Sequence, residues 1–166
     1  MVQRDLDVIV AGHVCLDIIP GFPQGHSYEA GDVFCPGTIV DVRQATVATG
    51  GPVSNTGIPL AKLGLKIAFM ARVGGDKFGR LTVDLLDRWA DTTGLSIRED
   101  EASSYTAVIA PPGVDRIFFH CPGTNHVFSA SDVDYDLCRR ARLFHLGYPP
   151  LMRRLFENDG QQLVEI

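Results

Sequence analysis

Short apolar runs alternate with amphipathic segments along this chain, and the alternation restricts the possible folds more than any other feature. The runs Leu6–Gly12 and Ile67–Val73 have the length and composition of buried β-strands. Between them, the segment that follows Gly51 repeats apolar residues at helical spacing and stops at Gly64. Because strands and helices alternate, the sequence predicts an α/β fold, a partial parallel sheet flanked by helices.

Spacing and capping residues predict the remaining helices. Asp76 is a suitable N-cap for a helix whose predicted inward residues are Phe78, Leu81, Leu85 and Trp89. Ser129–Ala141 predicts another capped helix, and Leu143–Tyr148 predicts a short strand. Pro149–Ile166 predicts a final amphipathic helix with three inward residues, Leu151, Leu155 and Phe156.

Two segments do not fit the parallel sheet. Thr38–Thr49 partly alternates apolar and polar residues, which is typical of a half-exposed strand. Tyr105–Cys121 predicts a hairpin around the turn PPGVD. We expect these segments to form a small antiparallel β lid beside the sheet, with its strands at about residues 28–49 and 105–121.

The bulk composition favours one folded domain over residues 1–166. Hydrophobic residues make up 45% of the chain, and the net charge of −5 argues against nucleic acid or an anionic membrane as the main partner. The cysteines at 15, 35, 121 and 138 have no metal-ligand spacing and suit a reducing cytosol. We therefore expect a soluble, cytoplasmic protein.

The stretch TGGPVSN places two glycines before a proline that suits the first turn of a helix. Gly50 and Gly51 would let a polar ligand approach the backbone, because no Cβ intervenes. Asn55 lies one turn further on, and its amide can both donate and accept hydrogen bonds. A tight strand–helix turn with a capping Asn would give the same pattern, so both interpretations stay open.

Asp17 stands a few residues beyond the first predicted strand, among apolar neighbours. In open α/β sheets, ligands bind at the carboxyl ends of strands, and a carboxylate there can accept two hydroxyl hydrogen bonds from a polyol. An Asp that caps a turn is the alternative.

Four segments occur in an order that resembles one known family. GHVCLD, then GGPVSNTGIPLAKLG, then ARVGGDKFG, resembles the N-terminal half of the PfkB family of carbohydrate kinases, which have the ribokinase-like fold. The later PPGVDRIFFHCPGTN resembles that family's lid hairpin and the turn after it. The resemblance runs from about Leu6 to the end of the chain.

The resemblance implies the site and the reaction. Asp17 would bind sugar hydroxyls, and Gly50, Gly51 and Asn55 would line the same pocket. Cys15 stands where ribokinases carry a ribose-binding asparagine, so another sugar, a sugar acid or a nucleoside is expected instead of ribose. The intact enzyme would use ATP and Mg²⁺, and the lid would also form a homodimer surface.

The family's second signature, a glycine-rich anion hole with a catalytic aspartate, has no match in these residues. We therefore expect no catalytic, nucleotide-binding or metal residue in this chain, and no ATP or Mg²⁺ bound by it alone. The chain ends inside a predicted helix after only about three or four parallel strands, so we expect a fragment or a chain that needs a partner.

Two other functions compete with the substrate-binding half of a sugar kinase. One is a non-catalytic sugar-binding or regulatory half-domain, and the other is a dinucleotide-binding oxidoreductase domain. The five histidines have no zinc spacing and are expected to be packed or on the lid surface. Of these, only His120 is placed where it could face a substrate from the lid.

Overall fold

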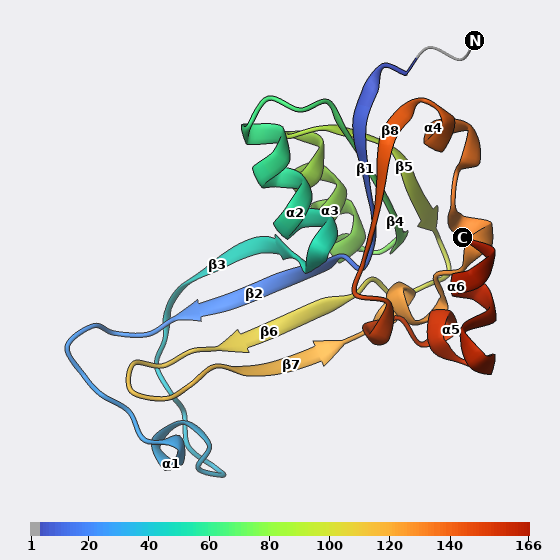
Figure 1. Cartoon of the computed structure of the whole chain (residues 1–166). Coiled ribbons are helices and arrows are strands. Elements are labelled where there is room, and N and C mark those ends of the chain that lie inside the picture. Colours follow the sequence, from blue (N-terminus) through green and yellow to red (C-terminus); the bar gives the residue numbers. More distant parts are fainter. Residues whose placement is uncertain (1–3) are drawn as a thin grey trace.

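The computed structural model describes residues 4–166, which form two four-stranded sheets with helices around one of them (Figure 1). The strands are β1 Leu6–Gly12, β2 Cys15–Gly21, β3 Arg43–Gly50, β4 Ile67–Gly74, β5 Asp91–Arg98, β6 Tyr105–Ile109, β7 Ile117–Cys121 and β8 Ala141–Gly147. The α-helices are α1 Ala30–Val33, α2 Gly51–Lys62, α3 Lys77–Asp87, α4 Tyr135–Arg139, α5 Arg153–Phe156 and α6 Gln161–Glu165. Four 3₁₀-helices complete the list: η1 Gly123–Val127, η2 Ala130–Asp132, η3 Pro149–Leu151 and η4 Asn158–Gly160.

The first sheet is parallel, in the order β5-β4-β1-β8, and it carries the hydrophobic core on both faces. Alternate residues of β1 point to opposite faces, so Ile9 and Ala11 pack towards α4 and α5, whereas Val8 and Val10 pack towards α2 and α3. Figure 1 shows α2 and α3 together on one side of this sheet. Burial on both faces explains the continuous apolar runs of β1 and β4, and the predicted α/β class is confirmed.

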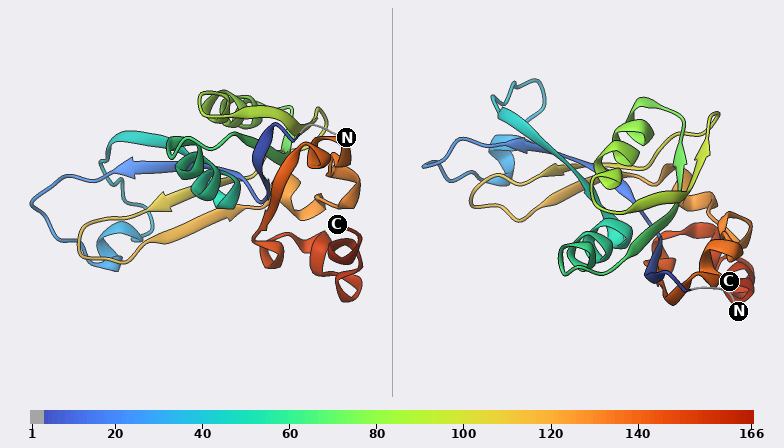
Figure 2. Two further views of the ribbon diagram at one scale, coloured as in Figure 1. Left: turned by 45° about the horizontal axis from the view of Figure 1, so that its top comes forward. Right: turned by 90° about the horizontal axis from the view of Figure 1, so that it is seen from above.

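The second sheet, in the order β3-β2-β6-β7, is the expected lid, but it is mixed and not antiparallel. β2 pairs antiparallel with β3 and parallel with β6, and β6 pairs antiparallel with β7. The sequence prediction missed β2, whose CLDIIPG contains an Asp and a Pro and lies next to a loop rich in Gly and Pro. Figure 2 shows this sheet projecting away from the parallel sheet.

Helix α2 follows its prediction, and α3 does not. Val53 is fully buried against β1 and β4, and Gly64, with φ of 89°, follows the end of α2. In α3 the buried residues are Gly79, Thr82 and Leu86. Phe78, Leu81 and Trp89 are all more than a third exposed, and Leu85 is only partly buried, so the predicted inward face was wrong.

The orientation of α3 is set by its first turn. Asp76 caps the helix by accepting a 2.8 Å hydrogen bond from the Gly79 amide. A Cβ at Gly79 would collide with the backbone of Gly74 at the end of β4. This close backbone contact, available only to glycine, turns the Gly79 face towards the sheet and leaves Phe78 outside, against Tyr105.

The predicted C-terminal helix is interrupted. Asp159 and Gly160 have φ values of 57° and 74°, which separates α5 from α6. Leu155 is completely buried as predicted, but Leu151 and Phe156 are each 51% exposed, so their inward placement was wrong. The helix predicted over Ser129–Ala141 is likewise two short pieces, η2 and α4, because the capping-box Ser129 and the N-cap Asp134 each start a separate turn.

An ion network around the buried Asp132 connects the parallel sheet to the segments that follow β5 and β7. The Asp132 carboxylate accepts hydrogen bonds from Arg72 (3.1 Å) on β4 and Arg98 (2.8 Å) on β5. Glu101 binds the same Arg72 side chain. Burial alone would raise the pKa of Asp132, but the two guanidinium groups hold this pKa below its usual range.

Within residues 4–166, none of the helices combines the length and apolar composition that crossing a bilayer requires.

Candidate substrate-binding site

A groove of about 580 Å³ opens where the chain passes from the parallel sheet into the lid. β1 ends at Gly12 and β2 begins at Cys15, so the His13–Val14 link joins the two sheets directly (Figure 1). The lining residues come from this link, from β2, α2, β6, β7 and from the segment after β8: His13, Cys15, Asp17, Gly51, Asn55, Thr106, Arg116, Phe118, His120, Tyr148 and Leu151.

Asp17 lies on β2, within the lid sheet, and not in the loop that the sequence suggested. Its carboxylate lies directly above Gly50, where an added Cβ would come within 2.8 Å of Cγ. The register places Cys15 opposite Gly50 and Asp17 opposite Ala48. The missing side chain at Gly50 therefore makes room for the carboxylate at the groove.

A chain of polar contacts on the groove face of the lid sheet links Asp17 on β2 to His120 on the edge strand β7. The Cys15 thiol donates to Asp17 Oδ1 (3.2 Å), and Thr106 Oγ1 donates to Cys15 Sγ (3.7 Å). Thr106 Oγ1 also lies 2.9 Å from His120 Nδ1. Burial, followed by the charge of Asp17, raises the pKa of Cys15 to about 12, so this thiol remains protonated and is a donor.

Thr106 also determines which atom of His120 is left for a ligand. Its hydroxyl contacts Nδ1, so Nε2 is the ring nitrogen of His120 that can meet other partners in the groove. While the single Thr106 hydroxyl hydrogen points to Cys15 Sγ, Nδ1 of His120 is the donor to Thr106 Oγ1 and Nε2 is the acceptor nitrogen.

Gly51 opens α2 at φ of 82°, a conformation that favours glycine. An added Cβ would meet the His13 carbonyl oxygen at 2.5 Å and His13 Nδ1 at 2.6 Å. Both glycines of TGGPVSN are thus required by packing within the chain, and their contact with a ligand stays a prediction. Asn55 is exposed at the groove, one turn into α2.

His13 is the buried lining residue whose polar side-chain atoms lack partners, and the sequence analysis did not select it. The residue is 3% exposed, and neither ring nitrogen has a hydrogen-bond partner among residues 4–166. A buried polar group without a partner costs about 1–3 kcal/mol. Burial, together with the nearby His120 and His126, lowers the pKa of His13 to about 4, so the ring is neutral. Its position directly after the Gly that ends β1 was the available sequence signal.

The structure thus brings four of the predicted residues, Cys15, Asp17, Gly51 and Asn55, to one groove, with Gly50 beneath the carboxylate. His120 joins them, as expected of a lid histidine. Sequence reasoning missed Thr106, Arg116 and Phe118, because the predicted lid hairpin did not show which of its side chains point into the groove, and it missed Tyr148, because only the fold brings the end of β8 here.

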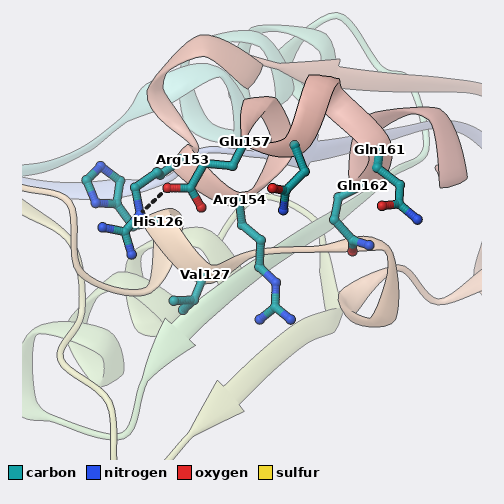
Figure 3. A pocket seen from close by; sticks show the side chains of 8 residues that line it. His126, Val127, Arg153, Arg154, Glu157, Gln161 and Gln162 are labelled. Carbon is teal, nitrogen blue, oxygen red and sulfur yellow. Dashed lines mark ion pairs between the residues drawn. The ribbon is translucent and has the colours of Figure 1, made fainter.

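A second hollow, of about 340 Å³, lies between η1 and the C-terminal helices (Figure 3). Arg153 is paired there with Glu157 at 3.2 Å, and Arg154 points away from that pair. The other lining side chains are His126, Val127, Asn158, Gln161 and Gln162. The acidic residue of this hollow, Glu157, is already paired with Arg153, and no glycine is among its lining residues. The groove at Asp17 is therefore the better candidate.

The comparisons with known proteins agree with this architecture. The sequence pattern of the pfkB family of carbohydrate kinases matches residues 7–158. The chain belongs to this family. The predicted resemblance is therefore confirmed, and the dinucleotide-binding oxidoreductase alternative loses its support.

Relatives of this pfkB-family chain include fructokinases and a 5-dehydro-2-deoxygluconokinase. It is 29% identical over 103 residues to "Probable fructokinase-7" of Arabidopsis thaliana, which covers 60% of this chain and 30% of that protein. It is 26% identical over 144 residues to "5-dehydro-2-deoxygluconokinase" of Geobacillus kaustophilus (strain HTA426), covering 84% of this chain and 39% of that protein.

Solved structures share the fold at low sequence identity. The fructokinase of Halothermothrix orenii superimposes with a TM-score of 0.64 at 22% identity, over 85% of this chain and 46% of that one. The ribokinase of Arabidopsis thaliana, complexed with ribose and ATP, has a TM-score of 0.64 at 20% identity, over 85% and 45%. In each of these four comparisons the chain spans less than half the length of the other protein.

Residues 4–166 of this pfkB-family chain do not fit ATP with Mg²⁺. The two long helices offer no obvious phosphate cradle, because the Val53 amide of α2 donates to the His13 carbonyl (3.3 Å) and the Asp76 carboxylate occupies the start of α3. The same residues contain no cluster of three or more His, Cys, Asp or Glu that could hold a metal ion. That the chain lacks a nucleotide site stays a prediction.

Proposed function

We propose that this chain is the substrate-binding half of an ATP-dependent sugar kinase, in which the γ-phosphoryl group of ATP is transferred to a sugar hydroxyl. One observation carries the proposal: in a member of the pfkB carbohydrate kinase family, the Asp17 carboxylate faces a groove and has only the Cys15 thiol as a side-chain partner within residues 4–166. A carboxylate can accept two hydroxyl hydrogen bonds from one sugar. ATP and Mg²⁺ would be held by residues outside the described part.

Each groove residue has a role in this proposal. Asp17 accepts hydrogen bonds from sugar hydroxyls, and Asn55 contributes an amide that donates or accepts. Cys15 orients the carboxylate through its protonated thiol. Gly50 and Gly51 keep the floor of the groove free of side chains.

The proposed acceptor is a sugar other than ribose, with a sugar acid or a nucleoside as the alternative. Several relatives are named as fructokinases, which favours a hexose. The groove contains apolar and aromatic surface from Phe118 and Tyr148, which suits the carbon skeleton of a sugar ring. Cys15, which cannot replace the amide of an asparagine, argues against ribose.

The lid sheet is also our proposed dimer surface. β3 and β7 form its two edges, and Val47 and Phe119, on the face of the lid sheet that points away from the groove, are 42% and 55% exposed. Exposed apolar side chains on a sheet commonly mark an interaction surface. Sedimentation velocity of the chain, with Phe119→Ser as the variant, tests this: the proposal requires a wild-type dimer that the variant weakens.

We also propose a cytoplasmic location, supported by four cysteines that are free in this structure. One relative is named as chloroplastic, so the compartment needs its own measurement by fractionation of the tagged protein.

A non-catalytic sugar-binding or regulatory half-domain is the second candidate function, because residues 4–166 contain the Asp17 groove and no cluster of three or more His, Cys, Asp or Glu that could hold a metal ion. A coupled ADP-release assay with ATP, Mg²⁺ and D-fructose, on the chain and on its longest genomic reading frame, separates the two. The kinase proposal requires sugar-dependent turnover in the longer protein and none in the chain alone. A longer protein that binds the sugar but never turns over would favour the regulatory module.

The test of the groove is sugar affinity by titration calorimetry across a panel of D-fructose, D-glucose, D-ribose and adenosine. Asp17→Asn removes the charge and keeps the shape, and the loss of a charge-assisted hydrogen bond costs about 1.5–3 kcal/mol, roughly tenfold to a hundredfold in Kd. Asp84→Asn is the matched control, since Asp84 is an exposed acid on α3 outside the groove. Equal affinities of wild type and Asp17→Asn for the best ligand would refute the assignment.

A further inference from the structure

We infer that His13 is a second hydroxyl-binding group of the sugar groove, covered in this structure by the rings of His120 and Tyr148. The inference rests on the proposed sugar-binding function and adds a specificity-determining residue to it. It starts from the two unpartnered ring nitrogens of His13, which packing alone does not explain.

The backbone of His13 is fixed on both sides, so the ring has a defined position. Its amide donates to the Gly147 carbonyl at the end of β8 (3.4 Å), and its carbonyl accepts from the Val53 amide in the first turn of α2 (3.3 Å). Gly51 presses against the ring at Nδ1, where a Cβ could not fit. Two elements of the parallel-sheet layer, β8 and α2, therefore hold this imidazole at the edge of the groove.

The chemical state of His13 suits a hydroxyl. A neutral imidazole has one N–H donor and one acceptor nitrogen, and a sugar hydroxyl can both accept and donate. Burial and the adjacent His120 and His126 keep the pKa of His13 near 4, so the acceptor nitrogen persists at neutral pH. Together with the Asp17 carboxylate, this gives the groove two different recognition groups for one polyol.

The two rings that cover His13 belong to different segments of the chain, which can move apart from it. His120 stacks on the His13 ring with 5.4 Å between centroids and 29° between planes, and it lies on the lid strand β7. Tyr148 lies 6.1 Å from the same ring, half exposed, in a left-handed conformation at φ of 57° directly after β8. Movement of the lid would carry His120 away and open the ring nitrogens to a ligand from the groove side.

The decisive experiment observes the histidine ring directly. The imidazole nitrogens of the uniformly ¹⁵N-labelled 166-residue chain are followed by NMR while D-fructose, D-glucose and D-ribose are added separately. The backbone amides of Asp17 and Asn55 are followed in the same titrations as independent reporters of binding. We expect one sugar to shift these amides and the His13 ring nitrogens together, with one apparent Kd, while the ring of His26 stays unchanged.

Variants then measure the contribution of His13 to the affinity for the sugar. We expect His13→Phe, which keeps an aromatic ring without nitrogens, to weaken binding of the best sugar at least tenfold, and His13→Gln to recover part of that loss. His26→Gln, in the exposed loop after β2, is the matched control and should bind within twofold of wild type. Monodeoxy analogues of the best sugar identify the hydroxyl: one analogue should bind wild type more weakly but bind His13→Phe as well as the parent sugar does.

The outcomes separate the inference from the proposed function. If a sugar shifts the Asp17 and Asn55 amides but leaves the His13 ring nitrogens unmoved, the inference is wrong and the sugar-binding function stands. Binding by His13→Phe within twofold of wild type leads to the same conclusion. If no sugar of the panel shifts any of these signals at saturating concentrations, the sugar-binding function of this chain fails and the inference fails with it. The ring measurement on the unmodified chain decides the question even if a variant does not fold.

Discussion

Gly50 and Gly51 are adjacent, yet each leaves room for a different neighbour. Gly50 makes room for the Asp17 carboxylate, and Gly51 makes room for the His13 ring and adopts a positive φ. The sequence suggested that both glycines admit a ligand to the backbone. Their packing shows that they also make room for two polar side chains at the groove, and contact between a ligand and their backbone stays a prediction.

A comparison of two glycine substitutions measures this contact. Gly51 and Gly64 have similar φ values, 82° and 89°, but nothing lies within 4 Å of a Cβ at Gly64. Gly64→Ala should therefore lose only the cost of a left-handed alanine, about 1–2 kcal/mol. Gly51→Ala should lose at least about 1 kcal/mol more in the free energy of unfolding, because it also displaces His13. Urea denaturation of both variants is the measurement. Equal losses in the free energy of unfolding would show that His13 moves aside at no measurable cost.

His13 should also make the stability of the fold depend on pH. Its pKa is about 4 in the folded chain and about 6.5 when unfolded, so the unfolded state binds the proton first as the pH falls. The stabilising contribution is complete above pH 6.5 and is lost between about pH 6.5 and 4, with a total of about 3 kcal/mol.

The control for this prediction is His13→Phe, which cannot bind the proton. The difference between wild type and variant in the free energy of unfolding, measured from pH 7.5 to 4.5, cancels the carboxylates that both proteins share. We expect wild type to lose stability relative to the variant as the pH falls. A difference that stays constant across this range would mean that His13 titrates normally in the folded chain.

At the scale of elements, periodicity predicted those parts whose burial follows from their own sequence. β1, β4 and α2 are such cases, because apolar residues alone define their inward sides. The face of α3 could not be predicted, since it is chosen by the backbone contact of Gly79 with Gly74. β2 was missed because its partners, β3 and β6, are distant in sequence and a strand with an inward Asp resembles a loop.

The residues of the candidate site likewise form two groups, those that local sequence could select and those that only the fold brings to the groove. Asp17, Cys15, Gly51 and Asn55 could be selected because local motifs contain them, whereas Thr106 and Tyr148 reach the groove only through the pairing of β6 with β2 and of β8 with β1. Long-range pairing leaves no local signal, so these residues could not be chosen without the fold.

The lid should open more readily than the parallel sheet. β7 is exposed at four of its five positions, whereas β1 and β4 are almost completely buried. The fair comparison is between interior strands, which are paired on both sides: β2 and β6 of the lid against β1 and β4. We expect amide hydrogens of the lid pair to exchange at least about tenfold faster, and a bound sugar to slow them. Equal protection in both pairs, with and without sugar, would count against a moving lid.

At the scale of the whole molecule, the groove lies where the short His13–Val14 link carries the chain from the parallel sheet into the lid sheet. The parallel sheet supplies rigidity through a core on both faces, and the lid sheet supplies Asp17, Cys15, Thr106 and His120. A ligand held between them would contact both layers, which couples binding to closure of the lid. A rigid parallel sheet and a lid sheet that carries binding residues agree with membership of the pfkB family and with the proposed sugar-kinase function.

The measurement that tests this account most directly is a crystal structure of the chain grown with D-fructose, or with whichever sugar of the panel binds best, at a concentration well above its Kd. We predict one sugar in the groove, with at least one hydroxyl within about 2.6–3.2 Å of the Asp17 carboxylate and another within reach of Asn55. A sugar bound in the hollow between η1 and the C-terminal helices, or a groove that stays without sugar in such crystals, would contradict the account.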